Sequence, residues 1–478
     1  MRAHRLAALV VTAALCVTAC GGPAPSPSGA SPVGPLPNNA AVTDAIAEAG
    51  LRAQLDRLAA ASAGFDTFRA TGTAGFDAAA AVVRAQLIAA GWTVTEDRFM
   101  APVFEDEGGS QLEVGGRSFT GGEIKPLIYA PSGEAAGPVV AIDWDPHATG
   151  PGTKGCKPAD YGNLPANAIV LVRSGPCYRR DEVLAAQAAG AAGFVAVIPG
   201  LPAGVVLRPT LITPDGLAIP AAAVSAEAAQ ALADAAAAGA TARLETHAKT
   251  RLTETASILS ELPGTAPDQA VMLGAHLDSV IDGPGMSDNA TGVAALLEIA
   301  RALAGTQPTA TIRLAFWTGE EVGLQGSAHY VRSLSQSAAQ AIVAYLNVDM
   351  VGSPNGFVGV YDEEAAAAGS DAVRALLAAG LTRLGTTPIG IDLGGGSDHV
   401  PFQQAGIPTG GVFSGASEVL DAAQAATFGG TMGARADTCY HLACDTMDNV
   451  NLPLARLLTA GLADLTVRLA TTPSLISR

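Results

Sequence analysis

Apolar, strand-like runs alternate with helical segments from about residue 248 to the end of the chain. The strand-like runs are ASILSELPG, QAVMLGAHLDS, TIRLAFWTGEE, AIVAYLNVDM and IPTGGVFSG, and helical segments such as GVAALLEIARALAG lie between them. This alternation predicts an α/β fold in which a mixed, mostly parallel sheet carries helices on both faces. Sheets of this kind bind ligands outside the carboxyl ends of their strands. The polar residues at those ends are therefore the first candidates for a functional site.

The alternation is interrupted by a block of different character. At 478 residues the chain is too long for one ordinary core. Residues 41–104 read as helical and then extended, whereas 105–247 hold many short strand-like runs separated by turn residues. We expect 105–247 to be a smaller, β-rich inserted domain, and 41–104 and 248–478 to form one main domain around it.

The N-terminal segment has the features of an export signal. Residues 1–20 carry two arginines, then an apolar stretch too short to span a membrane, then small residues. The end of this stretch, VTAC, is similar to a bacterial lipobox, which predicts a lipid on Cys20 and a flexible Pro/Gly/Ser tether over 21–40. We expect a lipoprotein on the outer face of the cell membrane, with this lipid as the sole anchor. An ordinary signal peptide and secretion is the alternative.

Charge and cysteine usage narrow the function further. The formal net charge of −17 leaves no basic surface of the kind that binds nucleic acid. With Cys16 removed in the signal and Cys20 lipidated, four cysteines remain, and an even number in an exported chain predicts disulfides. They are Cys156, Cys177, Cys439 and Cys444. Pairing each with its neighbour in sequence is the simplest of three arrangements. Zinc–thiolate binding is an alternative, but no Cys-x-x-Cys spacing supports it.

The three strand-like runs QAVMLGAHLDS, TIRLAFWTGEE and AIVAYLNVDM end in carboxylates or an imidazole, and the loop after the first adds another acid. The candidates are His276, Asp278, Asp288, Glu320, Glu321, Asp349 and, near the C-terminus, His441. Oxygen and nitrogen ligands that converge from several elements are what a divalent metal requires. Five of these residues suit two zinc ions, provided that one carboxylate bridges them. No motif supports a calcium site, and calcium stays an open alternative.

Two of these acids, Glu320 and Asp278, are not needed as metal ligands and are expected to have other roles. Glu320 adjoins the candidate ligand Glu321, and a free carboxylate beside activated water is a natural general base. Asp278 follows His276 by two residues, so its carboxylate can accept the second imidazole N–H and fix the ring's tautomer.

Six of these segments together resemble peptidase family M28, whose members are two-zinc aminopeptidases, with the secreted Streptomyces-type enzymes as the nearest pattern. The segments are GAHLDS, MSDNATG, WTGEE, NVDM, GGSDHVPF and CYHLACD, and the resemblance covers roughly 41–100 and 250–475. It implies His276 and Asp349 on one zinc, Glu321 and His441 on the other, and Asp288 between them. It also implies Glu320 as general base, and Tyr440 as a donor to the developing oxyanion.

The same resemblance implies further features. Cys439–Cys444 would staple the loop that carries Tyr440 and His441. The substrates would be peptides with free N-termini and an apolar first residue, and a monomer is expected. The inserted block resembles a protease-associated (PA) domain, with GCKPADYGN and AIVLVRSGPC as its disulfide-bearing segment. Such domains shape the mouth of an active site and carry no catalytic residues.

One position departs from the family pattern. Gly396 stands where an arginine is expected directly before the SDH triplet, which puts the peptide preference in doubt. Two other functions stay open: a one-zinc glutaminyl cyclase on the same fold, and an inactive peptidase fold that serves as a binding module. The remaining histidines and acids are expected to be structural or solvated. They are Asp143, Asp145, His147, His247, Asp282, His329, Asp398 and His399.

Overall fold

The computed structural model describes residues 34–477 apart from 67, 149 and 365. The predicted signal, Cys16, Cys20 and most of the predicted tether lie outside the described residues. The final tether residues include strand β1 (Gly34–Pro35), which pairs with β13 (Thr306–Gln307), and helix α1 (Asn39–Ala45). The described residues that pair with or precede the main-domain helices therefore begin slightly before residue 41. No helix of the described residues is both long and apolar enough to cross a membrane.

An eight-stranded mixed sheet forms the centre of the main domain, as predicted from the strand–helix alternation. The order across the sheet is β17-β16-β18-β15-β12-β14-β11-β2, and the central strands β14, β12, β15 and β18 run parallel. The strands are β2 (Thr93–Asp106), β11 (Ala248–Leu262), β12 (Ala266–His276), β14 (Ala310–Trp317), β15 (Ile342–Val348), β16 (Gly359–Tyr361), β17 (Ile389–Ile391) and β18 (Thr409–Phe413).

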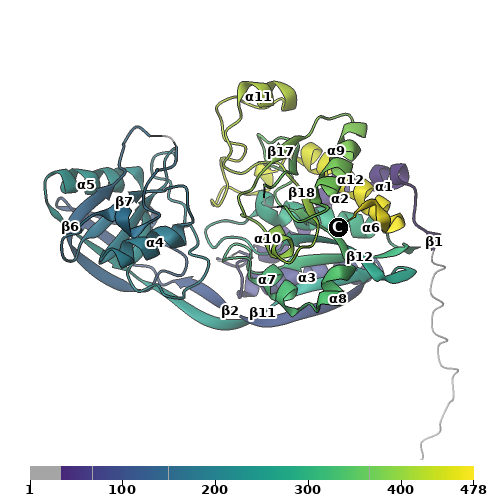
Figure 1. The fold of residues 1–478 in the computed structure, drawn as a ribbon, viewed down its shortest axis with the longest axis horizontal. Coiled ribbons are helices and arrows are strands. Elements are labelled where there is room, and N and C mark those ends of the chain that lie inside the picture. Colours follow the sequence, from purple (N-terminus) through teal and green to yellow (C-terminus); the bar gives the residue numbers. More distant parts are fainter. Residues whose placement is uncertain (1–33, 67, 149, 365, 478) are drawn as a thin grey trace, which may run out of the picture.

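Helices cover both faces of this sheet because its central strands are apolar on both sides. In β12, Val271 and Leu273 belong to the core under one helical layer, whereas Met272 packs with Trp317 and Phe402 on the opposite face. The first layer contains α2 (Glu48–Ser62), α3 (Ala74–Ala89), α6 (Thr291–Ala302), α9 (Ser370–Arg383) and α12 (Leu452–Thr471). The second contains α7 (Gln325–Ser333), α8 (Gln336–Ala341) and α10 (His399–Gln404), and α11 (Ala422–Phe428) lies in an outer loop (Figure 1).

A long two-stranded ribbon joins the main domain to the inserted domain. Strands β2 and β11 pair antiparallel along their whole shared length, from Thr93 opposite Glu261 to Asp106 opposite Ala248. In Figure 1 the ribbon runs along the bottom of the molecule from one lobe to the other. The chain thus enters and leaves the inserted domain through neighbouring strands of one sheet.

The inserted domain has its own eight-stranded sheet, in the order β4-β3-β10-β6-β7-β8-β9-β5. Its strands are β3 (Gln111–Val114), β4 (Arg117–Thr120), β5 (Ile124–Pro126), β6 (Gly133–Ile142), β7 (Ile169–Arg173), β8 (Gly193–Val197), β9 (Ala221–Val224) and β10 (Thr241–Thr246). Two helices, α4 (Arg179–Ala188) and α5 (Ala226–Ala237), pack on it over separate apolar cores.

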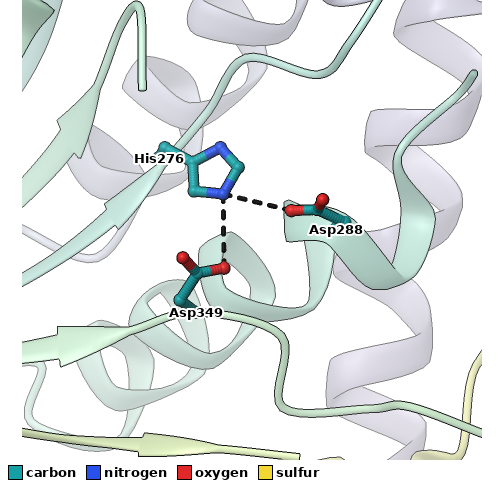
Figure 2. Close-up of side chains that lie close together, drawn as sticks. All are labelled: His276, Asp288 and Asp349. Atoms are coloured by element: carbon teal, nitrogen blue, oxygen red, sulfur yellow. Dashed lines mark hydrogen bonds and ion pairs between the residues drawn. The ribbon is translucent and has the colours of Figure 1, made fainter. Parts of the chain in front are cut away.

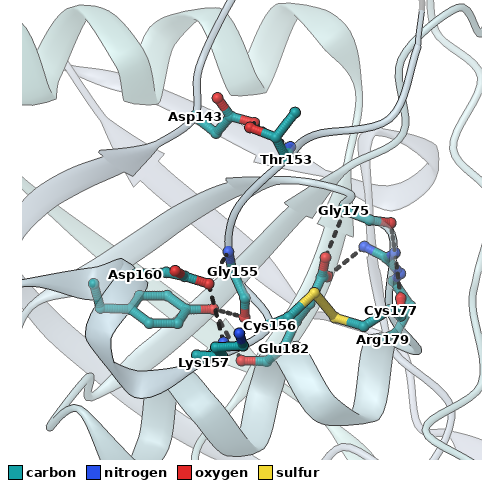
Figure 3. The surroundings of a disulfide bond; sticks show 11 residues. Asp143, Thr153, Gly155, Cys156, Lys157, Asp160, Gly175, Cys177, Arg179 and Glu182 are labelled. Atoms are coloured by element: carbon teal, nitrogen blue, oxygen red, sulfur yellow. Dashed lines mark hydrogen bonds and ion pairs between the residues drawn. A yellow bond between two sulfur atoms is a disulfide. The ribbon is translucent and has the colours of Figure 1, made fainter.

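A disulfide closes one loop of the inserted domain. Cys156 and Cys177 are bonded, with their Cα atoms 5.9 Å apart. Beside them the buried carboxylate of Glu182 accepts a hydrogen bond from the Gly175 N–H at 2.6 Å and pairs with the guanidinium of Arg179 (Figure 3). The loop that follows β7 is therefore held both covalently and by a buried ion pair.

The two domains are held together by a second ion-pair cluster, and this corrects one expectation. Asp282 was predicted to be a solvated loop acid, but its side chain is only 19% exposed. It accepts a hydrogen bond from Arg208 of the inserted domain at 3.0 Å and pairs with Lys125 at 3.2 Å. Arg208 also binds Asp106 at 2.7 Å. Two cations from the inserted domain satisfy this acid, which the local sequence could not show.

Candidate active site

The sequence-predicted ligands converge at the carboxyl ends of the central strands. His276 is the last residue of β12, and Asp349 follows the end of β15. Asp288 lies in the turn Met286–Ala290 that leads into α6, while Glu320 and Glu321 follow β14. Because parallel strands end at one edge of the sheet, side chains distant in sequence meet there. Figure 2 shows His276, Asp288 and Asp349 pointing toward one another from three separate elements.

Two clusters share a single carboxylate. In the first, His276 Nε2 lies 3.2 Å from Asp288 Oδ1 and 3.3 Å from Asp349 Oδ1. In the second, His441 Nε2 lies 3.1 Å from Asp288 Oδ2 and 3.1 Å from Glu321 Oε2. The ligand atoms of each set lie within 4.8 Å of one another. Each oxygen of Asp288 therefore faces a different histidine.

The residue that orients His276 is Asp278, but through a different group than predicted. The imidazole Nδ1 lies 3.1 Å from the main-chain carbonyl oxygen of Asp278 and 3.8 Å from its carboxylate. The carboxylate instead accepts hydrogen bonds from the main-chain N–H groups of Glu320 and Glu321, at 3.3 Å each. Thr71 donates to the same carboxylate at 3.0 Å. Asp278 thus fixes the turn that presents the two glutamates, and its carbonyl fixes the histidine.

Two further residues hold the candidate ligands and escaped the sequence analysis. Ser397 donates to Asp349 Oδ2 at 2.6 Å, which leaves the other oxygen facing His276. Asp445 accepts from the main-chain N–H groups of Ser287 and Asp288 at 2.8 and 3.0 Å. Ser397 lies in GGSDHVPF and Asp445 in CYHLACD, two of the segments on which the family resemblance rests. Their position in these segments is the sequence signal that could have identified them.

The hydrogen bond from Ser397 to Asp349 can be tested directly. If Asp349 is a zinc ligand as predicted, Ser397→Ala is expected to weaken zinc binding by about 10- to 100-fold, because partners that orient a ligating carboxylate contribute that much to metal affinity. Zinc affinity would be measured by competition with a chromogenic chelator. The exposed Ser337→Ala, on α8, is the control. Unchanged affinity in Ser397→Ala would show that this hydrogen bond does not orient Asp349.

A buried arginine supports the loop beneath the site. Arg69 is fully buried, and its guanidinium donates to three main-chain carbonyls, those of Leu277, Pro284 and Gly285. Its own N–H donates to Ser279 Oγ at 3.2 Å. The loop between His276 and Asp288 is therefore fastened to a residue more than 200 positions earlier. No local pattern around Arg69 indicates this role.

The clustered, buried carboxylates of the site favour the binding of a cation. Burial raises the pKa of Glu320 well above the ordinary value, and the carboxylates of Asp349 and Glu321 raise it further. Burial also raises the pKa of Glu321. Burial acts the same way on Asp288, but hydrogen bonds from His276 and His441 outweigh it, and the Asp288 pKa falls below the ordinary range.

The donor set fits a divalent metal. Glu321 Oε1 is buried and has no hydrogen-bond partner among the described residues, although its other oxygen faces His441. An orphaned carboxylate oxygen in a buried position costs free energy unless a cation or a donor satisfies it. Imidazole nitrogens with carboxylate oxygens are the ligands of catalytic zinc.

The clusters open into a cavity of about 190 Å³, which we call the strand-end cavity. Glu320 and Tyr440 both line it, and the Tyr440 ring stacks on His441 with centroids 3.8 Å apart. Tyr440 and His441 lie in the loop closed by the Cys439–Cys444 disulfide, whose Cα atoms are 5.3 Å apart. Gly396 also lines this cavity.

Within the described part of the chain, three other histidines have partners outside the two clusters. The ring of His329 stacks on Phe99, His247 pairs with Glu245 at 3.0 Å, and His399 pairs with Glu363 at 3.3 Å. Asp398 is buried and accepts a hydrogen bond from Ser327. Asp143 likewise accepts from Thr153 and Arg173 within the inserted domain. Asp145 accepts from the main-chain N–H of His147 at 2.9 Å. None of these belongs to the two metal-like clusters of the described residues.

An α/β sheet that gathers histidines and carboxylates at its strand ends is the arrangement of a metal-binding protein with its site at the sheet edge. The family model described as "Peptidase family M28" matches residues 257–466, and that of the PA domain matches 135–232. An aminopeptidase of Pseudomonas aeruginosa is 33% identical over 402 residues, covering 81% of this chain and 74% of the relative. The chain therefore belongs to peptidase family M28 and carries an inserted PA domain.

Other relatives and solved structures agree. The "Probable lipoprotein aminopeptidase LpqL" of Mycobacterium tuberculosis is 33% identical over 438 residues, covering 88% of this chain and 85% of the relative. The fold matches that of an aminopeptidase from Aneurinibacillus sp. strain AM-1 with a TM-score of 0.71 at 22% identity, covering 90% of this chain and 96% of that one. A zinc aminopeptidase from Bacillus subtilis matches with a TM-score of 0.67 at 20% identity, covering 88% and 95%.

Proposed function

We propose that this M28 aminopeptidase hydrolyses the first peptide bond of its substrates with two zinc ions and Glu320 as general base. The observation that carries the proposal is the position of Asp288, whose two oxygens face His276 and His441 at 3.2 and 3.1 Å. His276 and Asp349 would hold one ion, Glu321 and His441 the other, and Asp288 both. Zinc bound there would lower the pKa of water and polarise the scissile carbonyl.

The residues around the clusters would carry the proton and position the substrate. Glu320 lines the strand-end cavity and has no assigned ligand role. Its carboxylate would take a proton from the attacking water and return it to the leaving amine. The hydroxyl of Tyr440, in the same cavity, would donate to the oxygen on which negative charge develops. A substrate ammonium group would be held by Glu320 and Asp349.

The lining of the cavity favours an apolar first residue. Met350, Leu393 and Phe413 contribute apolar surface beside the clusters. Gly396 adds no side chain at the position where the family pattern led us to expect an arginine, so no cation stands there to select an acidic first residue. We therefore expect leucine, methionine or phenylalanine at the N-terminus of good substrates.

We further propose that the protein acts outside the cytoplasm, on peptides with free N-termini. The export-type segment at 1–20 and the two disulfides support this location. The similarity to a relative named as a lipoprotein supports an anchor at Cys20. The main domain would comprise 41–104 and 248–478, the PA domain 105–247, and the protein would act as a monomer.

Metal removal tests the proposal. Purified protein is expected to contain about two zinc ions per chain by elemental analysis, and dialysis against a chelator should abolish leucine p-nitroanilide hydrolysis. Adding back zinc should restore it. One zinc per chain with cyclisation of an N-terminal glutamine would instead support the cyclase. Loaded protein without any activity would support the binding module.

A further inference from the structure

A second cavity lies between the two domains, beside the strand-end cavity. It measures about 420 Å³ and is lined by Ile198, Pro199 and Leu207 of the PA domain and by Ser417, Arg435 and Tyr440 of the main domain. We call it the interdomain cavity. Ser417 and Tyr440 line both cavities. The two spaces are therefore neighbours that share a wall at the residue proposed to bind the oxyanion.

The position of this cavity suggests what enters it. If the N-terminal residue of a peptide occupies the strand-end cavity, as proposed above, the scissile carbonyl lies near Tyr440. The residues after the scissile bond must then leave past Tyr440, and the interdomain cavity opens on that side. Its apolar wall from the PA domain would contact their side chains.

One guanidinium in the interdomain cavity is available for a ligand. Arg179 also lines the cavity, but it is occupied, because it pairs with Glu182 and donates to the carbonyls of Gly175 and Cys177 at 2.8 and 2.9 Å (Figure 3). Arg435, by contrast, is half-buried, and its guanidinium donates one long hydrogen bond, of 3.3 Å, to the carbonyl of Gly200. Within the described part of the chain, no carboxylate lies within ion-pair distance of Arg435.

The PA-domain wall of the interdomain cavity is joined to the main domain by side-chain contacts. Arg208 follows Leu207 directly, and its guanidinium binds Asp106 and Asp282 at 2.7 and 3.0 Å. Tyr129 adds a hydrogen bond from its hydroxyl to the main-chain carbonyl of Val322 at 2.9 Å. These contacts hold the PA-domain wall of the cavity against the main domain that carries Arg435.

We propose that Arg435 binds a carboxylate on the part of the peptide that follows the scissile bond. This carboxylate is either the C-terminus of a dipeptide or tripeptide or an acidic side chain at the second position. A half-buried arginine without an acidic partner, in a protein of net charge −17, is suited to this because it forms charge-assisted, bidentate hydrogen bonds with carboxylates. Arg435 would be a specificity residue, not a catalytic one.

The test compares matched peptides that differ in one carboxylate. Leu-Gly and Leu-Gly-Gly would be assayed with free and with amidated C-termini, and Leu-Asp-Gly amide against Leu-Asn-Gly amide. The wild-type enzyme is expected to favour at least one carboxylate form by about tenfold in kcat/KM, chiefly through KM, as one charged hydrogen bond predicts. The ratio of kcat/KM between free and amidated peptides tests the C-terminal carboxylate. The ratio of kcat/KM between the Asp and Asn peptides tests the acidic side chain.

The variants decide whether Arg435 is responsible. Arg435→Gln should bring the preferred ratio to about one, and Arg435→Lys should keep part of it. Because each ratio is taken within one variant, partial loss of folded enzyme cancels. Arg117→Gln, at the far edge of the PA domain, should keep the wild-type ratios. The absence of a preference in the wild type, or its survival in Arg435→Gln, would overturn the proposal. Failure of the wild type to cleave leucine p-nitroanilide would instead overturn the proposed function.

Discussion

Glu320→Gln is expected to lower kcat for leucine p-nitroanilide by about 10³-fold, within the range that general acid–base catalysis contributes. The amide keeps the size of the side chain but cannot take a proton from water. Glu320 faces the strand-end cavity and stands next to, but outside, the two ligand clusters. Zinc content and the thermal midpoint of unfolding should therefore stay close to those of the wild type.

The test of Glu320→Gln requires the rate, the zinc content and the thermal midpoint to be measured on the same protein. Initial rates give kcat, elemental analysis gives zinc per chain, and circular dichroism gives the midpoint. Glu364→Gln, an exposed glutamate of the main domain, is the matched control and should be as active as the wild type. A fully active Glu320→Gln enzyme with normal zinc would remove Glu320 from the role of base.

Asp288→Asn should lower the zinc content below two ions per chain and lower activity by about 10³-fold or more. The change replaces one ligand oxygen with an amide N–H₂ group, which cannot bind a cation, and each oxygen of Asp288 faces a different cluster. Zinc contributes several kcal/mol to hydrolysis of this kind, and each 1.36 kcal/mol corresponds to about tenfold in rate.

Zinc per chain and kcat/KM would be measured across a range of added zinc. The matched control is Asp268→Asn, an exposed aspartate near the start of β12, which should bind zinc normally. If Asp288→Asn retained two zinc ions and near-normal activity, Asp288 would not be the bridge between the clusters.

A contact of the site could be predicted from the sequence where strand order alone brings its residues together, and not where its partners come from unrelated elements. The convergence of His276, Asp288 and Asp349 could be predicted because strand ends of a parallel sheet share one edge. The role of the Asp278 carboxylate was misassigned because its partners, Thr71 and the turn after β14, come from other elements. Arg69 was missed for the same reason, since its carbonyl partners belong to a loop far along the chain.

Features of the fold were likewise predictable where they follow from local sequence patterns, and not where they depend on residues far along the chain. The apolar strand runs and their helices were recognisable because each pattern is local to one element. Asp282 looked like a solvated acid because its neighbours in sequence are loop residues, whereas its cations come from the inserted domain. Long-range ion pairs and hydrogen bonds between different elements therefore account for what the sequence could not predict.

The ribbon of β2 and β11 has a consequence for how such a protein can change over evolutionary time. Asp106 and Ala248 are paired directly across it, so a tight turn could join the two strands and close them as a plain hairpin. An entire accessory module could thus be gained, lost or exchanged without re-threading the catalytic scaffold. The residues that would then lose partners are Asp106, Asp282 and the carbonyl of Val322, which marks them as the first positions to co-vary with the module.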